Sequence, residues 1–285
     1  MKFTISAGRR AGLFLCITLL CFIIGSVAVA IVTYGGMSAA RIRIAAIIQD
    51  IVMFIIPPVA TAVLITRRPA EYLMVMKGVR LAPALLIVAA ILASIPAMNS
   101  IVAWNQGISL PDSLSGIEEW MRQSETTAKN FTDTLIGTSG MGSLIMALLI
   151  VGILAGLSEE LFFRGGIQRM LITSGMNVHG AVWITAIIFS AVHVQFYGFV
   201  PRMLLGALFG YLTVWSGSLW TAIGAHALNN ILATIGYRLS ATSSINLDNI
   251  GTAEHPEGWI ISAISCVVTT GLLVMVYREL NRREN

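Results

Sequence analysis

The sequence contains very little charge: aspartate, glutamate, lysine and arginine together make up only 11% of its 285 residues. A soluble domain contains about 25% of these residues, whereas 56% of this chain is hydrophobic. The composition excludes an ordinary soluble domain and indicates a protein that crosses a membrane several times. We therefore interpret the net charge of +4 as an uneven distribution of charged residues among the loops. We expect the lipid bilayer to surround the chain, and we expect no nucleic-acid partner.

Cysteine is also rare. The three cysteines, Cys16, Cys21 and Cys266, each lie in an apolar run. Their spacing fits neither a metal site nor a disulfide framework, so we expect buried side chains that behave as small hydrophobes. The H-E-x-x-H motif of zinc-dependent metalloproteases does not occur either. The sequence therefore contains no local metal-binding motif.

Long apolar runs, by contrast, recur along the chain. The first, Ala11 to Tyr34, follows Lys2, Arg9 and Arg10. It is about twice as long as the apolar part of a signal peptide, so we interpret it as an uncleaved span. Spans are expected at residues 11–34, 44–66, 82–104, 143–172, 179–196, 203–215, 219–236 and 259–277. The predicted fold is all-α, a polytopic membrane protein with about eight transmembrane helices in one domain, residues 1–285.

Breaks and polar residues within these spans need an interpretation. Pro57-Pro58 should kink or break the second span, with neighbouring groups satisfying the freed carbonyls. Asp50 in the same span is interpreted as an interfacial acid near Arg43. Residues 198–201 are expected to form a break before the sixth span. Gly206 and Gly210 in that span form a small-xxx-small pair typical of close helix packing.

The loops predict the orientation. Basic residues crowd the loop after the second span, which the positive-inside rule places in the cytoplasm; they are Arg67, Arg68, Lys77 and Arg80. Residues 105–140 are acidic and are expected outside, with a surface helix from Pro111 to Asn130. Eight spans leave both termini cytoplasmic, and only Arg41 and Arg43 lie on the wrong side. The short loops suggest a bacterial inner (plasma) membrane.

Two adjacent carboxylates stand out within the fourth span. Glu159 and Glu160 follow an apolar run that begins at Ser143, and Arg164 comes four residues after Glu160. A carboxylate inside a bilayer costs roughly 2.5–3.5 kcal/mol on insertion scales, so it needs a partner or a function. Residues four apart share a helix face, so Glu160 and Arg164 are expected to pair. Glu159 points about 140° away from Arg164 and is left free.

Polar residues of two further spans are expected at the same depth. Glu159 and His193 are each 17 residues from the turn near residue 176. In an antiparallel helix pair they therefore face each other, because a helix rises about 1.5 Å per residue. The same count along the sixth span brings His226 of the seventh span to within a few Å of that level. Asn230, four residues after His226, lies on the same face.

This combination of side chains predicts hydrolysis of an amide within the membrane. A carboxylate removed from water, such as Glu159, is a candidate general base toward water, which His193 would orient. His226 and Asn230 would donate to the oxyanion that forms when water attacks a carbonyl. Arg164 would neutralise Glu160. Any one of these residues could be structural, but their common depth favours a function.

The same residues resemble the three motifs of the CAAX prenyl protease and bacteriocin-processing (ABI, CPBP) family. These are Glu159-Glu160-x-x-x-Arg164, Phe189-x-x-x-His193 and His226-x-x-x-Asn230, in order within 72 residues. The resemblance implies an intramembrane glutamate-type endopeptidase on an eight-helix fold, with its catalytic core in residues 143–236. Eukaryotic members of the family remove the last three residues from prenylated C-terminal motifs. Here the substrate is expected to be a membrane-associated peptide or protein.

Family members were long labelled metalloproteases, so the metal question stays open. We expect no metal and no other cofactor; if zinc is bound, Glu159, His193 and His226 would hold it. Two other functions are considered. A non-catalytic immunity or scaffold protein would keep the fold without needing intact motifs. A proton-coupled transporter would also use intramembrane Glu and His, but it predicts inverted repeats or broken helices.

Overall fold

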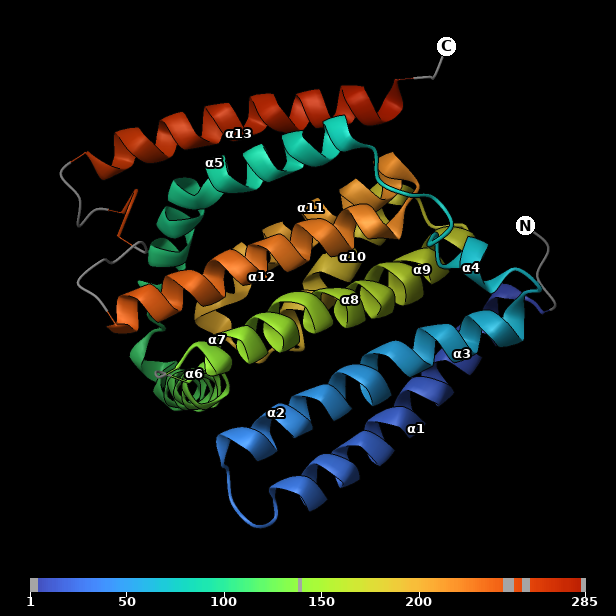
Figure 1. The fold of residues 1–285 in the computed structure, drawn as a ribbon, viewed down its shortest axis with the longest axis horizontal. Coiled ribbons are helices and arrows are strands. Elements are labelled where there is room, and N and C mark those ends of the chain that lie inside the picture. Colours follow the sequence, from blue (N-terminus) through green and yellow to red (C-terminus); the bar gives the residue numbers. More distant parts are fainter. Residues whose placement is uncertain (1–4, 138–139, 243–248, 253–256, 283–285) are drawn as a thin grey trace.

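The computed structural model describes residues 5–137, 140–242, 249–252 and 257–282. Within these ranges all regular secondary structure is helical, which confirms the all-α class. Each apolar run forms a helix because a helix satisfies its own backbone N–H and C=O groups without water. Figure 1 shows most of these helices running side by side across the molecule, as expected for a bundle in a bilayer.

The N-terminal half contains five α-helices, of which α4 is one short turn; they are α1 (Ala7–Thr33), α2 (Ala39–Ile48), α3 (Ile56–Ile65), α4 (Pro69–Tyr72) and α5 (Leu81–Gln106). The connection to the second half contains η2 (Asp112–Leu114) and α6 (Ser115–Ile136). The second half contains α7 (Met141–Ala147), α8 (Ala155–Glu160), α9 (Arg169–Thr173), α10 (Val178–Ala191), η5 (Phe196–Gly198), α11 (Phe199–Ser216), α12 (Leu219–Thr242) and α13 (Gly258–Asn281).

Three π-helical segments join α-helices into longer rods; they are η1 (Gln49–Ile55), η3 (Leu148–Leu154) and η4 (Leu161–Gln168). The predicted break at Pro57-Pro58 does not occur, since η1 leads directly into α3 with both prolines in its first turn. The π-helical turn of η1 directly precedes the prolines, and such local adjustments let a membrane helix accommodate proline without breaking. Residues 141–173 form a second continuous rod, named here the central helix, with η3 and η4 on either side of Glu159 and Glu160.

The count of eight crossings is not confirmed. All eight predicted spans correspond to helical segments, and six of these are long and apolar enough to cross a membrane. The α10 helix has only 14 residues. The α12 helix has 24 residues but is not among the six, and it carries the polar residues His226, Asn229 and Asn230.

Several predicted boundaries were wrong. The α10 helix ends at Ala191, five residues before the predicted Phe196. The α11 helix begins at Phe199, so the predicted break at 198–201 is partly its first turn, and Pro201 is accommodated there. The surface helix α6 runs from Ser115 to Ile136 rather than from Pro111 to Asn130.

The outside of the bundle is apolar. Leu19, Ile23 and Val267 are more than half exposed, as expected of side chains that face lipid. Cys21 is buried, but Cys16 and Cys266 are exposed, so the prediction that all three are buried was wrong for two of them. A cysteine side chain is apolar enough to face lipid.

The helices form three layers around the central helix (Figure 1). The α5 and α13 helices pack together along one edge, and α1 packs against α2 and α3 along the other. Between them, the central helix contacts α12 through η3 and α8, and it contacts α10 through η4. Any polar group on the inner faces of these three helices is therefore removed from lipid.

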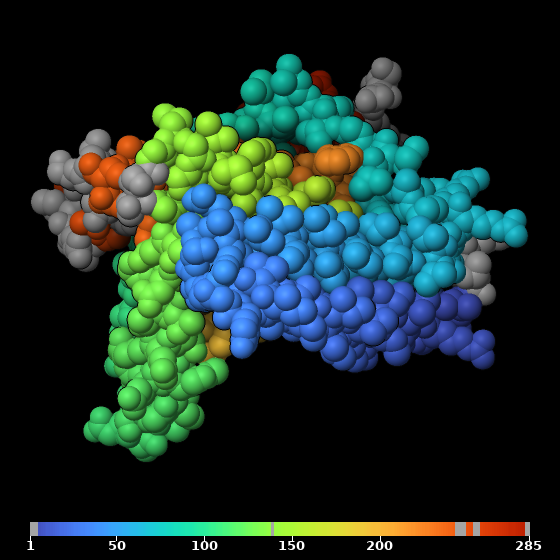
Figure 2. Space-filling view, turned by 60° about the horizontal axis from the view of Figure 1, so that its bottom comes forward, coloured from blue at the N-terminus to red at the C-terminus, as the bar shows by residue number. Residues whose placement is uncertain are grey.

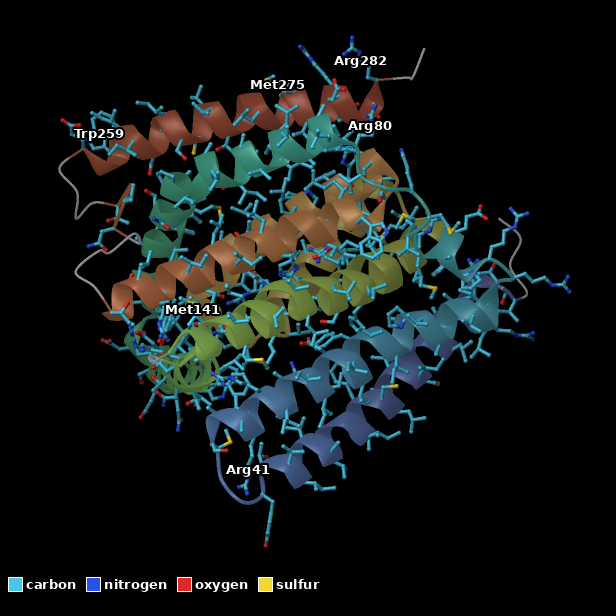
Figure 3. The ribbon with its side chains drawn as sticks, viewed as in Figure 1. Arg41, Arg80, Met141, Trp259, Met275 and Arg282 are labelled. Atoms are coloured by element: carbon cyan, nitrogen blue, oxygen red, sulfur yellow. The ribbon has the colours of Figure 1, made fainter. Side chains whose placement is uncertain are left out.

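The two ends of the bundle can be told apart by the termini and by α6. The start of α1 and the end of α13 lie at the same end (Figure 1). Figure 3 shows Arg80 and Arg282 at that end and Arg41 at the opposite one. The α6 helix lies at the end of Arg41, and Figure 2 shows it standing out from the body.

Cations at the α6 end make structural contacts. Nε of Arg43 donates to the carbonyl of Leu135 at 3.2 Å, and its guanidinium also donates to Ser143. Arg238 donates to the carbonyl of Gly137. These contacts bind the last turn of α6, whose carbonyls lack helical partners, to α2 and α12. Arg43 and Arg238 therefore have a structural role at this end of the bundle.

Candidate active site

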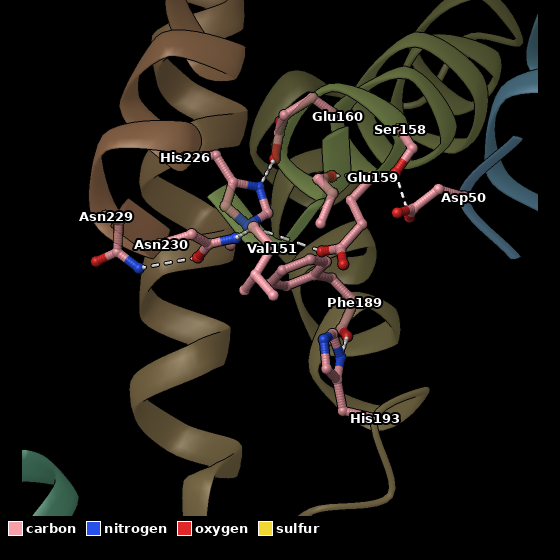
Figure 4. Close-up of polar contacts among 12 residues, drawn as sticks. Asp50, Val151, Ser158, Glu159, Glu160, Phe189, His193, His226, Asn229 and Asn230 are labelled. Atoms are coloured by element: carbon pink, nitrogen blue, oxygen red, sulfur yellow. Dashed lines mark hydrogen bonds and ion pairs between the residues drawn. The ribbon is translucent and has the colours of Figure 1, made fainter. Parts of the chain in front are cut away.

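The centre of the site is a buried ion pair on the central helix. Nη1 of Arg164 lies 2.6 Å from Oε1 of Glu160, and both side chains are fully buried. Nδ1 of His226, on α12, is 2.8 Å from the same oxygen. Figure 4 shows the contact between His226 and Glu160, which joins the two helices. The predicted pairing of Glu160 with Arg164 is thus present, and Glu160 also holds His226.

The same helix face is bound to α11. Nη2 of Arg164 donates to the carbonyl of Gly206 at 2.7 Å, and Nε2 of Gln168 donates to the carbonyl of Gly210 at 3.1 Å. Both donors and both acceptors are four residues apart, so two adjacent helical turns meet in register. The absence of side chains at Gly206 and Gly210 leaves their carbonyls accessible and lets α11 approach α10, as the small-xxx-small pattern predicts.

Aromatic rings complete the surroundings of this pair. The guanidinium carbon of Arg164 lies 4.8 Å from the ring centre of Phe189 and 5.6 Å from that of Phe209. Phe209 also stacks on His226 with ring centres 4.8 Å apart. A guanidinium above a ring face is stabilised by the ring quadrupole. Arg164 therefore has one carboxylate, one carbonyl and two rings as partners and has no contact with solvent.

Glu159 differs from its neighbour. Its Oε2 lies 3.7 Å from Nε2 of His226, and its side chain is 19% exposed. No described residue places an ammonium or guanidinium group within ion-pair distance of it. Figure 4 shows its carboxylate pointing toward the imidazole of His226. Glu160 is thus committed to structure, whereas Glu159 is available for a ligand.

His193 lies outside the helix that was predicted to carry it. It follows the end of α10, in a turn whose next residue, Val194, has a φ of 53°. This region disfavours a β-branched residue. Nδ1 of His193 is 2.8 Å from the carbonyl of Phe189, and a carbonyl only accepts. Nδ1 therefore carries the proton, and Nε2 of the neutral ring is an acceptor.

Asn230 is positioned by a π-helical segment of the central helix. The amide of Ala155 donates to the carbonyl of Ile150, five residues back, instead of to Val151, four residues back. The carbonyl of Val151 is thus available, and Nδ2 of Asn230 donates to it at 3.0 Å. One of the two N–H groups of Asn230 is used in this bond, and the second remains for a ligand.

The four residues Glu159, His193, His226 and Asn230 line one cavity of about 480 Å³. Its volume lies in the range of small-molecule and cofactor sites. Its wall also includes Thr132 and Ile136 of α6, so the cavity extends from the middle of the bundle toward the α6 end. Glu160 and Arg164 are not part of the wall; they lie behind it.

Asp50 belongs to the surroundings of this site, and its interpretation as an interfacial acid near Arg43 was wrong. Its side chain is buried, and it accepts a hydrogen bond of 2.7 Å from the hydroxyl of Ser158. Ser158 directly precedes Glu159, and Figure 4 shows Asp50 on the side of Glu159 that is opposite the histidines. Helical periodicity along η1 could have predicted the position of Asp50 only if the face of η1 that contacts the central helix had been known.

The residues do not fit a zinc site. Across the described ranges, no group of three or more His, Cys, Asp or Glu side chains is arranged to hold a metal ion. The conditional set Glu159, His193 and His226 is therefore not brought together as a ligand group. No step of the chemistry is assigned to a metal.

A glycine permits the close approach of the two helices that carry the site. A Cβ at Gly156 would lie 3.0 Å from the backbone nitrogen of Ala227, the residue after His226, and 3.1 Å from its Cα. We expect Gly156→Ala to push α12 away and to destabilise the fold by about 1–3 kcal/mol. The shift would also change the position of His226. The measurement is thermal unfolding together with peptide cleavage.

Gly224→Ala is the matched control. Gly224 lies on α12, the helix that Gly156 contacts, and a Cβ there would meet nothing within 4 Å. It should leave cleavage unchanged and stabilise the helix slightly, since alanine is the better helix former by about 1 kcal/mol. Equal effects of the two variants would mean that the contact between α8 and α12 is not tight.

Comparison with known proteins gives one match. Residues 141–232 match the family model described as type II CAAX prenyl endopeptidase Rce1-like. Neither the curated proteins nor the solved structures give a match. The matched range covers the central helix and most of α12, and so contains all six residues predicted for the site. The match confirms the resemblance seen in the three motifs: residues 141–232 are similar to the Rce1-like family of type II CAAX prenyl endopeptidases.

Proposed function

We propose that the protein is an intramembrane endopeptidase in which Glu159 and His193 activate water and His226 and Asn230 stabilise the oxyanion. The observation that carries the proposal is the shared cavity, to which all four side chains contribute. Glu160 and Arg164 act as positioning residues behind it. The substrate is a membrane-associated peptide or protein whose scissile bond enters this cavity.

The steps follow from the donors and acceptors. Nε2 of His193 accepts a hydrogen bond from the water, because its Nδ1 proton is held by Phe189. Glu159 removes a proton from this water as the water oxygen attacks the carbonyl carbon of the peptide bond. The tetrahedral intermediate collapses when the C–N bond breaks, and Glu159 returns the proton to the leaving amine. The products are a carboxylic acid and an amine.

The oxyanion needs donors that are in place before the reaction. Asn230 supplies the N–H that Val151 does not use. His226 donates Nδ1–H to Glu160, so it offers a second proton on Nε2 only as the doubly protonated ring. The carboxylates of Glu159 and Glu160, on either side of the ring, are the anions that such a cation requires. His226 is thus hydrogen-bonded to Glu160 and faces Glu159 at 3.7 Å.

The protein is integral to a membrane, and we assign it to a bacterial inner membrane with both termini in the cytoplasm. The basic residues near the described ends of the chain and in the loop before α5 support this orientation. The cavity then extends toward the outer side, because its wall includes residues of α6. The proton-coupled transporter gains no support from the geometry, since the helix with Pro57-Pro58 is continuous. The non-catalytic immunity or scaffold protein is the alternative that the experiment below tests.

The experiment that tests the function removes one imidazole at a time. The purified protein in liposomes is incubated with a degenerate peptide library, and products are identified by mass spectrometry. His193→Ala is expected to slow cleavage by about 10²-fold or more. His179→Ala removes an imidazole that contacts Tyr211 and does not line the cavity, so it should cleave at the wild-type rate. Equal rates for His193→Ala and the wild-type protein would contradict the proposal.

A further inference from the structure

One cation in the wall of the cavity is not used by the mechanism. Arg202 lies in the first turns of α11 and lines the same cavity as Glu159 and His193. The sequence placed it in the connection before the sixth span, but α11 begins at Phe199 and takes it into the bundle. Arg202 is partly buried. A guanidinium at such a place needs an anion or a function.

The protein supplies Arg202 with neutral partners only. Nη1 donates to the backbone carbonyl of Gln195 at 3.3 Å, and Nη2 donates to Oε1 of the same residue at 2.8 Å. No carboxylate of a described residue lies within 4.0 Å of it. The carboxylate of Glu125, on α6, instead accepts a hydrogen bond from the amide of Tyr197. Gln195 therefore orients the guanidinium without neutralising it.

Gln195, the partner of Arg202, lines a second cavity next to the site. This cavity, of about 640 Å³, lies between α6 and the bundle, and its wall includes Gln49, Trp120, His193 and Gln195. His193 and Thr132 belong to the walls of both cavities. The two cavities are therefore adjacent, and Gln195 in the wall of the second binds Arg202 in the wall of the first.

We propose that Arg202 binds a carboxylate of the substrate and thereby positions the scissile bond at Glu159. The planar guanidinium suits a carboxylate, which it can hold through two parallel hydrogen bonds. The carboxylate is either the C-terminus of the substrate or an acidic side chain at a fixed distance from the cleaved bond. The inference deepens the proposed function and rests on it. Arg202 is a specificity residue, because it contacts the substrate away from the reacting atoms.

The test compares two degenerate peptide libraries of the same sequences, one ending in free carboxylates and one in carboxamides. Wild-type protein in liposomes is expected to cleave the free-acid library about tenfold faster or more. Arg202→Gln should remove this preference by raising KM, while the rate with the carboxamide library stays unchanged. Arg202→Lys keeps the charge and should retain part of the preference.

Each other result has a meaning. If both libraries are cleaved equally but the cleaved peptides share an Asp or Glu at one position, and Arg202→Gln removes that enrichment, the carboxylate bound is a side chain. Equal cleavage without such an enrichment would overturn the role of Arg202 and leave the proposed function intact. A uniform loss of rate in Arg202→Gln on both libraries would also overturn it, since that result indicates a structural residue.

A binding experiment separates failure of the proposed function from failure of the proposed role of Arg202. The libraries are also bound to Glu159→Gln protein and to Glu159→Gln/Arg202→Gln protein, with no cleavage required. Capture of carboxylate-bearing peptides by the first and not by the second supports the anchor even if no cleavage by wild-type protein is seen. Equal capture by both proteins contradicts it.

Discussion

Glu159→Gln is expected to lower the rate of peptide cleavage by about 10²–10⁴-fold, the usual contribution of a general base. The amide of glutamine has the same shape as the carboxylate but cannot take a proton from water. Glu159 forms no ion pair with an arginine or lysine of the described chain, and its side chain is 19% exposed. The fold should therefore tolerate the change. The measurement is the initial cleavage rate of the peptide library by the protein in liposomes.

Glu119→Gln is the matched control, because it removes a glutamate carboxylate from the exposed surface of α6. It should cleave at the wild-type rate. The thermal unfolding temperatures of both variants should stay near that of the wild-type protein. A Glu159→Gln protein that is folded and still cleaves at the wild-type rate would mean that another group activates the water.

The parts of the site that lie within one helix were predictable from the sequence. The spacing of four between Glu160 and Arg164 implies a shared face, and the two side chains are in contact at 2.6 Å. The same holds for His226 and Asn230, which both line the cavity. Local periodicity is sufficient here because an α-helix fixes the relative direction of residues within one turn.

The parts that depend on where a helix ends were not predictable. The apolar run of the fifth span continues through Val192 and Val194, and nothing in its composition marks the end of α10 at Ala191. His193 is therefore in a turn and not on a helix face. The early start of α11 likewise takes Arg202 from a connection into the cavity wall. Both differences arise from tertiary packing, which hydropathy does not record.

Contacts between distant spans also could not be predicted from the sequence. Asp50 lies 108 residues before its partner Ser158, and its helix is not part of the matched range 141–232. The π-helical segment that frees the carbonyl of Val151 for Asn230 has no motif of its own. Such segments are frequent at functional sites, and here two of them flank Glu159 and Glu160.

Arg164→Leu is expected to destabilise the protein by about 3–5 kcal/mol, the cost of removing one partner of a buried ion pair. The change leaves Glu160 fully buried, with His226 as its remaining side-chain partner among the described residues. It also leaves the carbonyl of Gly206 without its donor and opens a space beside Phe189 and Phe209. The measurement is the free energy of unfolding in mixed detergent micelles.

Lys129→Leu is the control for this change, because Lys129 forms an ion pair of the same i, i+4 spacing with Asp133 on the exposed face of α6. An exposed pair of this kind contributes about 0.3–0.5 kcal/mol. The contrast between the two variants therefore measures what burial adds to the same pairing.

The double variant Glu160→Leu/Arg164→Leu separates the effect of losing the ion pair from the effect of leaving one buried charge unpaired. It removes both charges at once, so its destabilisation should be smaller than the sum of the two single changes by about 0.5–3 kcal/mol. If the two single effects instead add, Glu160 and Arg164 act independently, and the central helix is held by its contacts with α11 and α12 rather than by this pair. Cleavage should be lost in either case, because Glu160 also holds His226.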